Sequence, residues 1–334
     1  MAFTVTLRPS GHTFTANADT TLLQAALDAG LTLPYGCRNG ACGSCKGTVL
    51  EGEVDHGKIQ DHALPAAERT AGKALFCCAS PRSDLTLECR EVGAAKDIAV
   101  RIMPCRVHKL ERVADDVMIM SLRLPTNERL QFLAGQYIEI MLKDGARRAF
   151  SIAHAPHDDE LVTLHIRHVP GGRFTDHVFS AMKEKEILRF QGPLGSFFLH
   201  EESKKPIILV AGGTGFAPIK SIVEHAIHAG MTRPMTIYWG ARDRAGLYQP
   251  ELPAQWAAAH SHIRYVPVLS DAAWEGRTGL VHRAVLDDHA DLSAFQAYVC
   301  GAPAMVDAAR VDFAAAGLPD EEFFADSFSF ASLS

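Results

Sequence analysis

The sequence has 334 residues, enough for two or three domains, and its content of 47% hydrophobic and 22% charged residues is typical of packed globular proteins. The formal net charge of −6 leaves no basic surplus to neutralise a phosphate backbone, which argues against nucleic acid as a partner. The first residues lack the apolar core of a signal peptide, and no run of about 18 apolar residues occurs. We therefore expect a cytoplasmic protein that does not bind a membrane.

The hydrophobic pattern divides the chain into three segments. The first begins with two strand-like runs and a helical stretch at 21–29, followed by a loop rich in glycine and cysteine. The second has short alternating runs separated by turn residues, which predicts an antiparallel β-barrel or a sandwich. The third alternates strands and helices from 207–211 onward, which predicts a parallel α/β sheet. We predict domains at residues 1–95, 98–201 and 203–334.

Four of the eight cysteines have the spacing of a plant-type 2Fe–2S ferredoxin. Cys37, Cys42 and Cys45 lie in one loop, and Cys77 follows at a distance. Interleaved glycines allow this loop to wrap closely around a cluster and leave amide N–H groups free to point at sulfur. The spacing therefore predicts these four cysteines as iron ligands.

Two alternatives to this assignment stay open. A structural zinc site also takes four cysteines, but its usual pattern is two short cysteine pairs, so the three-plus-one spacing favours iron. Cys78 is adjacent to Cys77 and could replace it as the fourth ligand. The apolar run at 74–76 directly before Cys77 favours Cys77.

The stretches YGCRNGACGSCKGTVLEGEV and FCCASPRSDL resemble the ferredoxin domain of three-component oxygenase reductases, and equally that of CDP-6-deoxy-Δ3,4-glucoseen reductases. The resemblance extends through all three segments. It implies a β-grasp ferredoxin domain, a flavin-binding β-barrel and a Rossmann-like NAD(P)-binding domain in one multidomain enzyme. Such an enzyme passes electrons from NAD(P)H through FAD and the cluster to an acceptor protein.

The resemblance leaves the acceptor open. The first hypothesis is a partner oxygenase of the Rieske or di-iron type, and the alternative is a deoxysugar dehydratase. A zinc-stabilised binding module without enzymatic activity is a third possibility. We expect the chain to be a monomer. FAD is preferred over FMN because related reductases that begin with the ferredoxin domain typically carry FAD.

Two motifs resemble the flavin-binding stretches of the ferredoxin–NADP reductase superfamily. The first runs from Arg148 to Ser151. The resemblance implies that Arg148 binds the flavin phosphate, that Phe150 packs on the isoalloxazine and that Ser151 hydrogen-bonds near N5. In the second stretch, a glycine turn precedes a predicted helix at 176–182 and would cradle the pyrophosphate. The flavin contacts predicted there are His165, Arg167, Val169, Gly171, Gly172 and Thr175.

The third segment carries a nucleotide-binding signature. A buried strand runs into a glycine-rich turn and then a helix, the geometry that binds a dinucleotide pyrophosphate. The residues concerned are Gly213, Thr214, Gly215 and Pro218. By resemblance, Cys300 and Gly301 lie beside the nicotinamide C4 and the flavin N5, which makes Cys300, with Ser151, a catalytic candidate.

The remaining predictions concern the ribose 2′-position of the nucleotide and the ring of the flavin. Asp243 suits the free 2′-hydroxyl of NADH, whereas Arg242 and Arg244 suit the 2′-phosphate of NADPH. We favour NADH, with NADPH as the alternative. By analogy with relatives, Phe328 in the aromatic C-terminal stretch is a candidate to shield the flavin ring.

Overall fold

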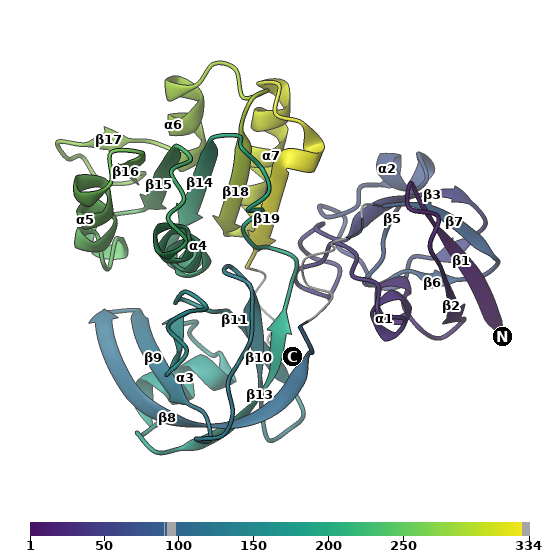
Figure 1. Cartoon of the computed structure of the whole chain (residues 1–334), viewed down its shortest axis with the longest axis horizontal. Coiled ribbons are helices and arrows are strands. Elements are labelled where there is room, and N and C mark those ends of the chain that lie inside the picture. Colours follow the sequence, from purple (N-terminus) through teal and green to yellow (C-terminus); the bar gives the residue numbers. More distant parts are fainter. Residues whose placement is uncertain (90, 92–97, 329–334) are drawn as a thin grey trace. The chain divides into compact units, whose positions relative to one another are not determined.

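A computed structural model describes the chain except for residues 90, 92–97 and 329–334 (Figure 1). The described residues divide into two compact units, Met1–Ala99 and Val100–Ser334. The first unit contains the cysteine loop. The second contains both the predicted flavin segment and the predicted nucleotide segment.

The first unit is built on a five-stranded mixed sheet with the order β2-β1-β7-β3-β5. Its strands are β1 (Ala2–Arg8), β2 (Thr13–Asn17), β3 (Lys46–Glu51), β5 (Lys73–Leu75) and β7 (Leu85–Glu88). A two-stranded ladder joins β4 (Val54–Asp55) to β6 (Ser80–Pro81), and a short helix, α2 (Ala66–Thr70), precedes β5.

Helix α1 (Leu22–Asp28) covers the sheet of the first unit with a buried face that includes Leu22 and Leu23. Thr21 caps the helix, since its hydroxyl oxygen accepts the Gln24 amide at 3.3 Å. A helix packed on a mixed sheet in which β1 and β7 run parallel is a β-grasp arrangement.

The second unit begins with a six-stranded antiparallel sheet of order β11-β10-β13-β8-β9-β12. Its strands are β8 (Arg101–Ala114), β9 (Val117–Arg123), β10 (Tyr137–Met141), β11 (Arg147–Ser151), β12 (Val162–Arg167) and β13 (Ile187–Leu194). A bridge between Ile152 and Leu164 joins the two edge strands and closes the sheet into a barrel. Helix α3 (Arg173–Ser180) begins at Arg173, ahead of the predicted start at Asp176.

A six-stranded parallel sheet of order β17-β16-β15-β14-β18-β19 follows. Its strands are β14 (Ile207–Gly212), β15 (Met235–Ala241), β16 (Ile263–Leu269), β17 (Arg277–Thr278), β18 (Gln296–Gly301) and β19 (Phe323–Ser327). The helices are α4 (Phe216–His228), α5 (Glu251–Ala259), α6 (Val281–Asp288) and α7 (Pro303–Ala315). The apolar residues of α4 and α5 belong to one core cluster and those of α6 and α7 to another, so the sheet is covered on both faces.

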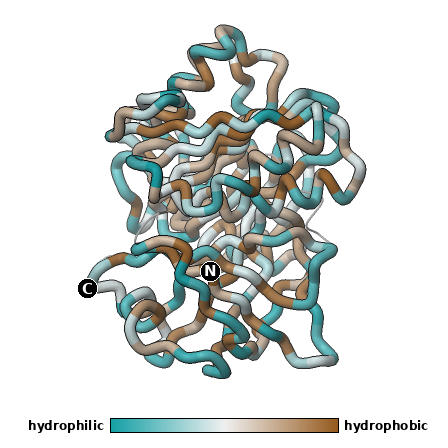
Figure 2. Tube along the Cα trace, turned by 90° about the vertical axis from the view of Figure 1, so that its left-hand side faces the viewer, coloured by the Kyte–Doolittle hydropathy of each residue, from teal (hydrophilic) through white to brown (hydrophobic). Residues whose placement is uncertain are grey.

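Hydropathy follows this organisation. In Figure 2 many inner stretches of the tube are brown and white, whereas many outer turns are teal. The parallel strands carry continuous runs of buried residues, such as Ile207–Ala211 in β14, as expected for strands covered on both faces. In the part of the chain that the structure describes, no helix is both long and apolar enough to cross a membrane.

Candidate functional site

The cysteine loop lies between α1 and β3. The amide of Cys37 donates to the sulfur of Cys42 at 3.4 Å, and the amide of Cys42 donates to the sulfur of Cys37 at 3.3 Å. Gly40 has a positive φ of 76°, and a Cβ at this position would lie 2.8 Å from the Lys58 carbonyl oxygen. The loop is therefore tightly wound with amide hydrogens directed at sulfur, an environment that fits an anionic iron–sulfur cluster.

The four predicted ligands occur as two pairs. Cys37 and Cys42 form the first, and the interacting side chains of Cys77 and Cys45 form the second. Among the described residues, no three or more His, Cys, Asp or Glu side chains come together around one point that could hold a single metal ion. Two pairs suit a two-iron cluster, in which each iron takes two thiolates, better than a single tetrahedral zinc ion.

Cys77 and Cys78 differ in their surroundings. Cys77 is buried and contacts Cys45, whereas Cys78 is half-buried and its sulfur lies against Gly40, 2.9 Å from where a Cβ would stand. The two sulfurs are 3.6 Å apart. This arrangement supports Cys77 as the fourth ligand, which stays a prediction.

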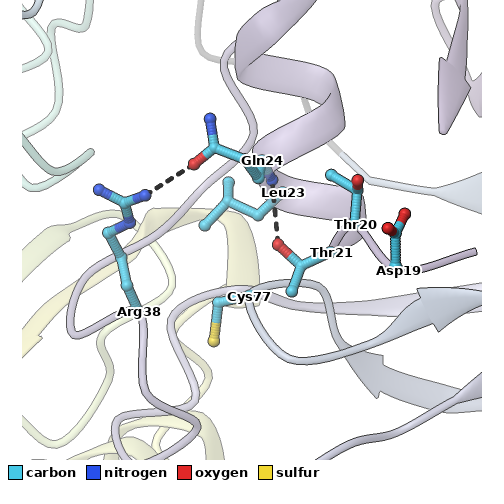
Figure 3. Close-up of a pocket in the computed structure, with 7 residues that line it drawn as sticks. All are labelled: Asp19, Thr20, Thr21, Leu23, Gln24, Arg38 and Cys77. Carbon is cyan, nitrogen blue, oxygen red and sulfur yellow. Dashed lines mark hydrogen bonds between the residues drawn. The ribbon is translucent and has the colours of Figure 1, made fainter. Parts of the chain in front are cut away.

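Cys77 also lines a surface pocket of about 350 Å³ (Figure 3). Among its lining residues, the guanidinium of Arg38 donates to the Gln24 side chain at 2.8 Å, and Figure 3 shows Cys77 below Leu23 and Thr21. The remaining lining residues are Asp19 and Thr20. One predicted cluster ligand therefore borders a mainly polar hollow that is open to solvent.

The first flavin motif lies on β11. Arg148 and Phe150 lie on one side of this strand and Ser151 on the other, as alternation requires. Arg148 is half-buried and donates to the carbonyl of its neighbour Arg147 at 2.8 Å. The ring of Phe150 lies 5.4 Å from that of Phe174 on α3. The cationic and aromatic groups thus share a surface, which fits the phosphate and ring contacts implied by the resemblance.

The second flavin motif forms the turn between β12 and α3. Thr175 is 8% exposed, and its hydroxyl contacts both the amide and the carbonyl of Val169, at 3.1 Å and 2.9 Å. Gly171 has a positive φ of 80°, and Gly172 precedes the first residue of α3. Thr175 therefore holds the turn in shape and leaves phosphate contacts to the backbone and to neighbouring side chains.

Two residues of β12 face the nucleotide segment. His165 is buried and its Nδ1 lies 2.8 Å from the hydroxyl of Tyr248, while burial lowers the pKa of its imidazole to about 3. Arg167 pairs with Asp116 at 2.8 Å, and its guanidinium lies 3.0 Å from where a Cβ at Gly213 would stand. The ring of His165 thus contacts the nucleotide segment, and its predicted flavin contact stays a prediction.

The glycine-rich turn connects β14 to α4. Gly213 and Thr214 belong to a single 3-10 turn with Gly215, and Pro218 is buried in the first turn of α4. A Cβ at Gly215 would lie 2.1 Å from the carbonyl oxygen of Cys300, so only glycine fits there. The Gly213 carbonyl accepts the indole N–H of Trp239 at 3.0 Å. The turn is therefore fixed against β15 and β18 before any nucleotide binds.

Three side chains from distant parts of the sequence converge beside this turn. The hydroxyl of Ser151 donates to Oδ2 of Asp326 at 3.3 Å, and the sulfur of Cys300 lies 4.0 Å from the same oxygen. All three residues are buried, and burial raises the pKa of Asp326 from 3.8 to about 6. Burial also raises the pKa of Cys300 well above its usual range, so its thiol is neutral.

Sequence reasoning missed Asp326. The available signal was a lone acidic residue directly after the apolar run Phe323–Ala325, in a strand expected to be buried. Pairing of β18 with β19 places Asp326 opposite Cys300. Its burial, its raised pKa and its place beside two candidate catalytic side chains make Asp326 a candidate residue of the same site.

The remaining predicted residues lie around the edges of this site. The carbonyl of Gly301 accepts the amide of Phe328 at 2.8 Å, and the Phe328 side chain packs against the core. Asp243 is exposed, and its Oδ1 accepts the Gly246 amide at 3.0 Å, which caps the 3-10 turn Arg244–Gly246. The end of the aromatic stretch, from residue 329 onward, lies outside the described residues.

Three family models match consecutive parts of the chain. They are the 2Fe-2S iron-sulfur cluster binding domain at 5–82, the oxidoreductase FAD-binding domain at 104–199 and the oxidoreductase NAD-binding domain at 209–311. Their order is that of the cysteine loop, the barrel and the parallel sheet. They identify the groups bound by these domains as a 2Fe–2S cluster, FAD and NAD.

Relatives match along the whole chain. The CDP-6-deoxy-L-threo-D-glycero-4-hexulose-3-dehydrase reductase of Yersinia pseudotuberculosis is 42% identical, covering 98% of this chain and 99% of the relative. The reductase component DmpP of phenol 2-monooxygenase from a Pseudomonas species is 36% identical, covering 98% and 95%. The structure of the Amycolatopsis cytochrome P450 reductase GcoB is similar with a TM-score of 0.80 at 34% identity, covering 99% of this chain and 100% of GcoB. The chain therefore belongs to the family of NAD(P)H-dependent iron–sulfur flavoprotein reductases that join a 2Fe–2S ferredoxin domain, an FAD-binding domain and an NAD-binding domain.

Proposed function

We propose that this chain takes electrons from NADH and delivers them one at a time to a separate acceptor protein. The observation that carries the proposal is the convergence of Ser151, Cys300 and Asp326 beside the glycine-rich turn, in a chain that also carries two pairs of cysteines in a ferredoxin fold. The first group suits a hydride-transfer site and the second suits an electron exit.

Bound FAD and a bound two-iron cluster would together supply the conversion of a two-electron hydride into single electrons. The chain's own residues provide position and exclude water. Gly215 allows the nucleotide turn to approach Cys300, and the buried Cys300 offers a neutral thiol surface to the nicotinamide. Ser151 donates to Asp326, which keeps the hydroxyl at the end of β11 in a fixed orientation toward the flavin site.

Residues of the first unit support the exit of electrons. The sulfurs of Cys37, Cys42, Cys45 and Cys77 would hold the cluster, with Cys78 as a neighbouring free thiol. Cys77 borders the pocket shown in Figure 3, where an acceptor could approach a cluster ligand through few intervening atoms. Two residues that line this pocket, Arg38 with its guanidinium and Gln24 with its amide, would offer polar contacts to that acceptor.

The acceptor that we propose first is an oxygenase of the Rieske or di-iron type. The reductase component of phenol 2-monooxygenase is 36% identical over nearly the full length, and it supports this choice. Reduction of the purified protein by NADH and by NADPH, followed by visible spectroscopy and electron paramagnetic resonance, tests the flavin and the cluster together. A protein that holds zinc without iron and shows no flavin absorbance would contradict the proposal.

A sugar dehydrase is the second candidate acceptor, favoured by the 42% identity to the Yersinia reductase. An assay in which NADH reduces the chain and each candidate acceptor is then added would separate the two candidates. Electrons delivered to a CDP-6-deoxyhexulose dehydrase, with no delivery to an oxygenase component, would select the second. Neighbouring genes give a first indication, because a nucleotide-sugar dehydratase gene supports the second candidate and a Rieske subunit gene supports the first.

We also propose the finer organisation of the chain. The domains would span 1–95, 98–201 and 203–334, and the protein would act as a cytoplasmic monomer that engages its acceptor transiently. Size-exclusion chromatography with light scattering tests the monomer, and limited proteolysis near the two predicted joints tests the boundaries.

A further inference from the structure

The loops that follow β15 and β16 are joined to each other. The amide of Ser270 donates to the carbonyl of Ala241 at 3.0 Å, and the amide of Asp271 donates to the carbonyl of Arg242 at 2.9 Å. These bonds extend the parallel pairing of the two strands beyond their carboxyl ends. Residues of the second loop are therefore held beside residues of the first.

An ion pair connects the tips of the two loops. The guanidinium of Arg244 bonds the carboxylate of Glu275 and lies 5.7 Å from the centre of the Trp274 ring. The indole N–H of Trp274 donates to the Arg277 carbonyl at 2.7 Å, and a Cβ at Gly276 would lie 2.4 Å from the ring. The ring is fixed on its own loop, so it offers Arg244 a stable surface for cation–π stacking.

These loops lie at the end of the sheet where the adenosine of a dinucleotide is expected. Gly212, which opens the nucleotide turn, is paired with Gly240 on β15. In folds of this type the pyrophosphate binds at the first turn and the ribose 2′-position meets residues at the end of the second strand. Arg244 stands four residues beyond Gly240 and is thus a cation within reach of a 2′-substituent.

We infer that Glu275 makes the site selective for NADH by occupying Arg244 and by repelling a 2′-phosphate. The phosphate of NADPH carries about two negative charges at neutral pH, so it would have to displace Glu275 from Arg244 while lying close to that carboxylate. The free hydroxyl of NADH meets no such competition. The inference rests on the proposed oxidation of NADH and identifies the residue that sets the choice between the two nucleotides.

The test compares nucleotide selectivity in Glu275→Gln with that of the wild-type holoenzyme. The ratio of kcat/KM for NADPH to kcat/KM for NADH, measured with ferricyanide, should rise about fivefold, which corresponds to about 1 kcal/mol for an exposed charge contact. The affinity for 2′,5′-ADP, measured by calorimetry, should rise by a similar factor. This second measurement does not depend on flavin or cluster chemistry.

Two further variants assign the effect. Arg244→Ala in the Glu275→Gln background should return both quantities to wild-type values, because the gain acts through Arg244. Glu321→Gln removes an exposed carboxylate near the start of β19 and should change neither quantity. An unchanged ratio and affinity in Glu275→Gln, or a gain that persists without Arg244, would overturn the inference. Failure of both nucleotides to reduce the protein would instead contradict the proposed function, while 2′,5′-ADP affinities would still decide the role of Glu275.

Discussion

The Nδ1 atom of His165 lies 2.8 Å from the hydroxyl oxygen of Tyr248, and this buried hydrogen bond joins the flavin barrel to the nucleotide segment. The ring of Tyr248 in turn meets Trp239 edge to face, with centroids 5.2 Å apart. Trp239 donates to the carbonyl of Gly213. A continuous set of contacts therefore runs from β12 to the turn expected to bind the pyrophosphate.

The first prediction concerns Tyr248→Phe. This change keeps the ring on Trp239 but leaves the buried Nδ1 of His165 without its partner, so the stability of the folded chain should fall by about 1–3 kcal/mol. Urea unfolding measures the loss. The KM for NADH should stay within about twofold, because the ring still supports the turn.

Tyr265→Phe is the matched control. The hydroxyl of Tyr265 is buried with no hydrogen-bond partner among the described residues, so its removal should leave stability unchanged or raise it. Equal losses of stability in the two variants would show that the hydrogen bond between His165 and Tyr248 does not itself stabilise the fold.

A second prediction separates the adjacent cysteines. Cys77→Ser should abolish the cluster signal in electron paramagnetic resonance and the one-electron output to cytochrome c, because the buried partner of Cys45 is lost. NADH-dependent ferricyanide reduction at the flavin should persist. Cys78→Ser should retain all three properties. The reverse pattern would make Cys78 the fourth ligand.

A third prediction tests the role of Cys300. Cys300→Ala should slow flavin reduction by NADH by at least about tenfold in stopped-flow absorbance, because small errors in the alignment of reacting groups reduce rates strongly. The cluster spectrum should not change. Cys105→Ala also removes a buried sulfur, in this case from β8 in the barrel core, and controls for lost packing. Equal rates in Cys300→Ala and the wild type would assign Cys300 a structural role only.

A fourth prediction follows from the carboxyl group of Asp326, whose pKa is raised from 3.8 to about 6 by burial. Between these values the folded chain holds a proton that the unfolded chain has released, so this group lowers stability as the pH rises from about 4 to about 6. Asp326→Asn removes the contribution. Compared with the variant, the wild type should therefore lose about 2 kcal/mol more stability between pH 4.5 and 7.5.

Urea unfolding of both proteins at the two pH values measures this difference. Asp320→Asn provides the control, since this carboxyl group is exposed. Identical pH dependence in the wild type and Asp326→Asn would mean that Asp326 ionises normally and that its burial has no energetic consequence.

Local patterns in the sequence predicted much of the fold. The spacing of Cys37, Cys42 and Cys45 indicated the cluster domain, and the family model for that domain confirms it. The strand predicted at 207–211 corresponds to β14 (Ile207–Gly212), since a parallel strand buried on both faces is a nearly continuous apolar run. In each of these cases the signal lies within a few residues along the chain.

Other elements had weaker signals. Strand β13 occupies the middle of the barrel sheet, yet Gly192 and Pro193 interrupt its apolar alternation, and we predicted no strand there. Helix α2 has only five residues, too few for a helical period to be visible.

The site itself depends on distant contacts. Ser151 and Asp326 are 175 positions apart, and neither sequence neighbourhood indicates the other. The flavin contact of His165 stays a prediction from the resemblance, and no local pattern indicated the bond between its ring and Tyr248, a residue 83 positions away. Contacts of this kind are decided by how the barrel and the parallel sheet pack, which local periodicity does not encode.

The bridge that closes the barrel has one more consequence. Ser151 is the last residue of β11, and Ile152, directly after it, pairs with Leu164 on β12. If the bridge between Ile152 and Leu164 opened, Ser151 would move away from Asp326. The Ser151 hydroxyl therefore donates to the Asp326 carboxylate only while the barrel is closed. Slow hydrogen exchange of the amides of Ile152 and Ala153, which donate to Gln136 and Thr163, would therefore report that the redox centre is assembled.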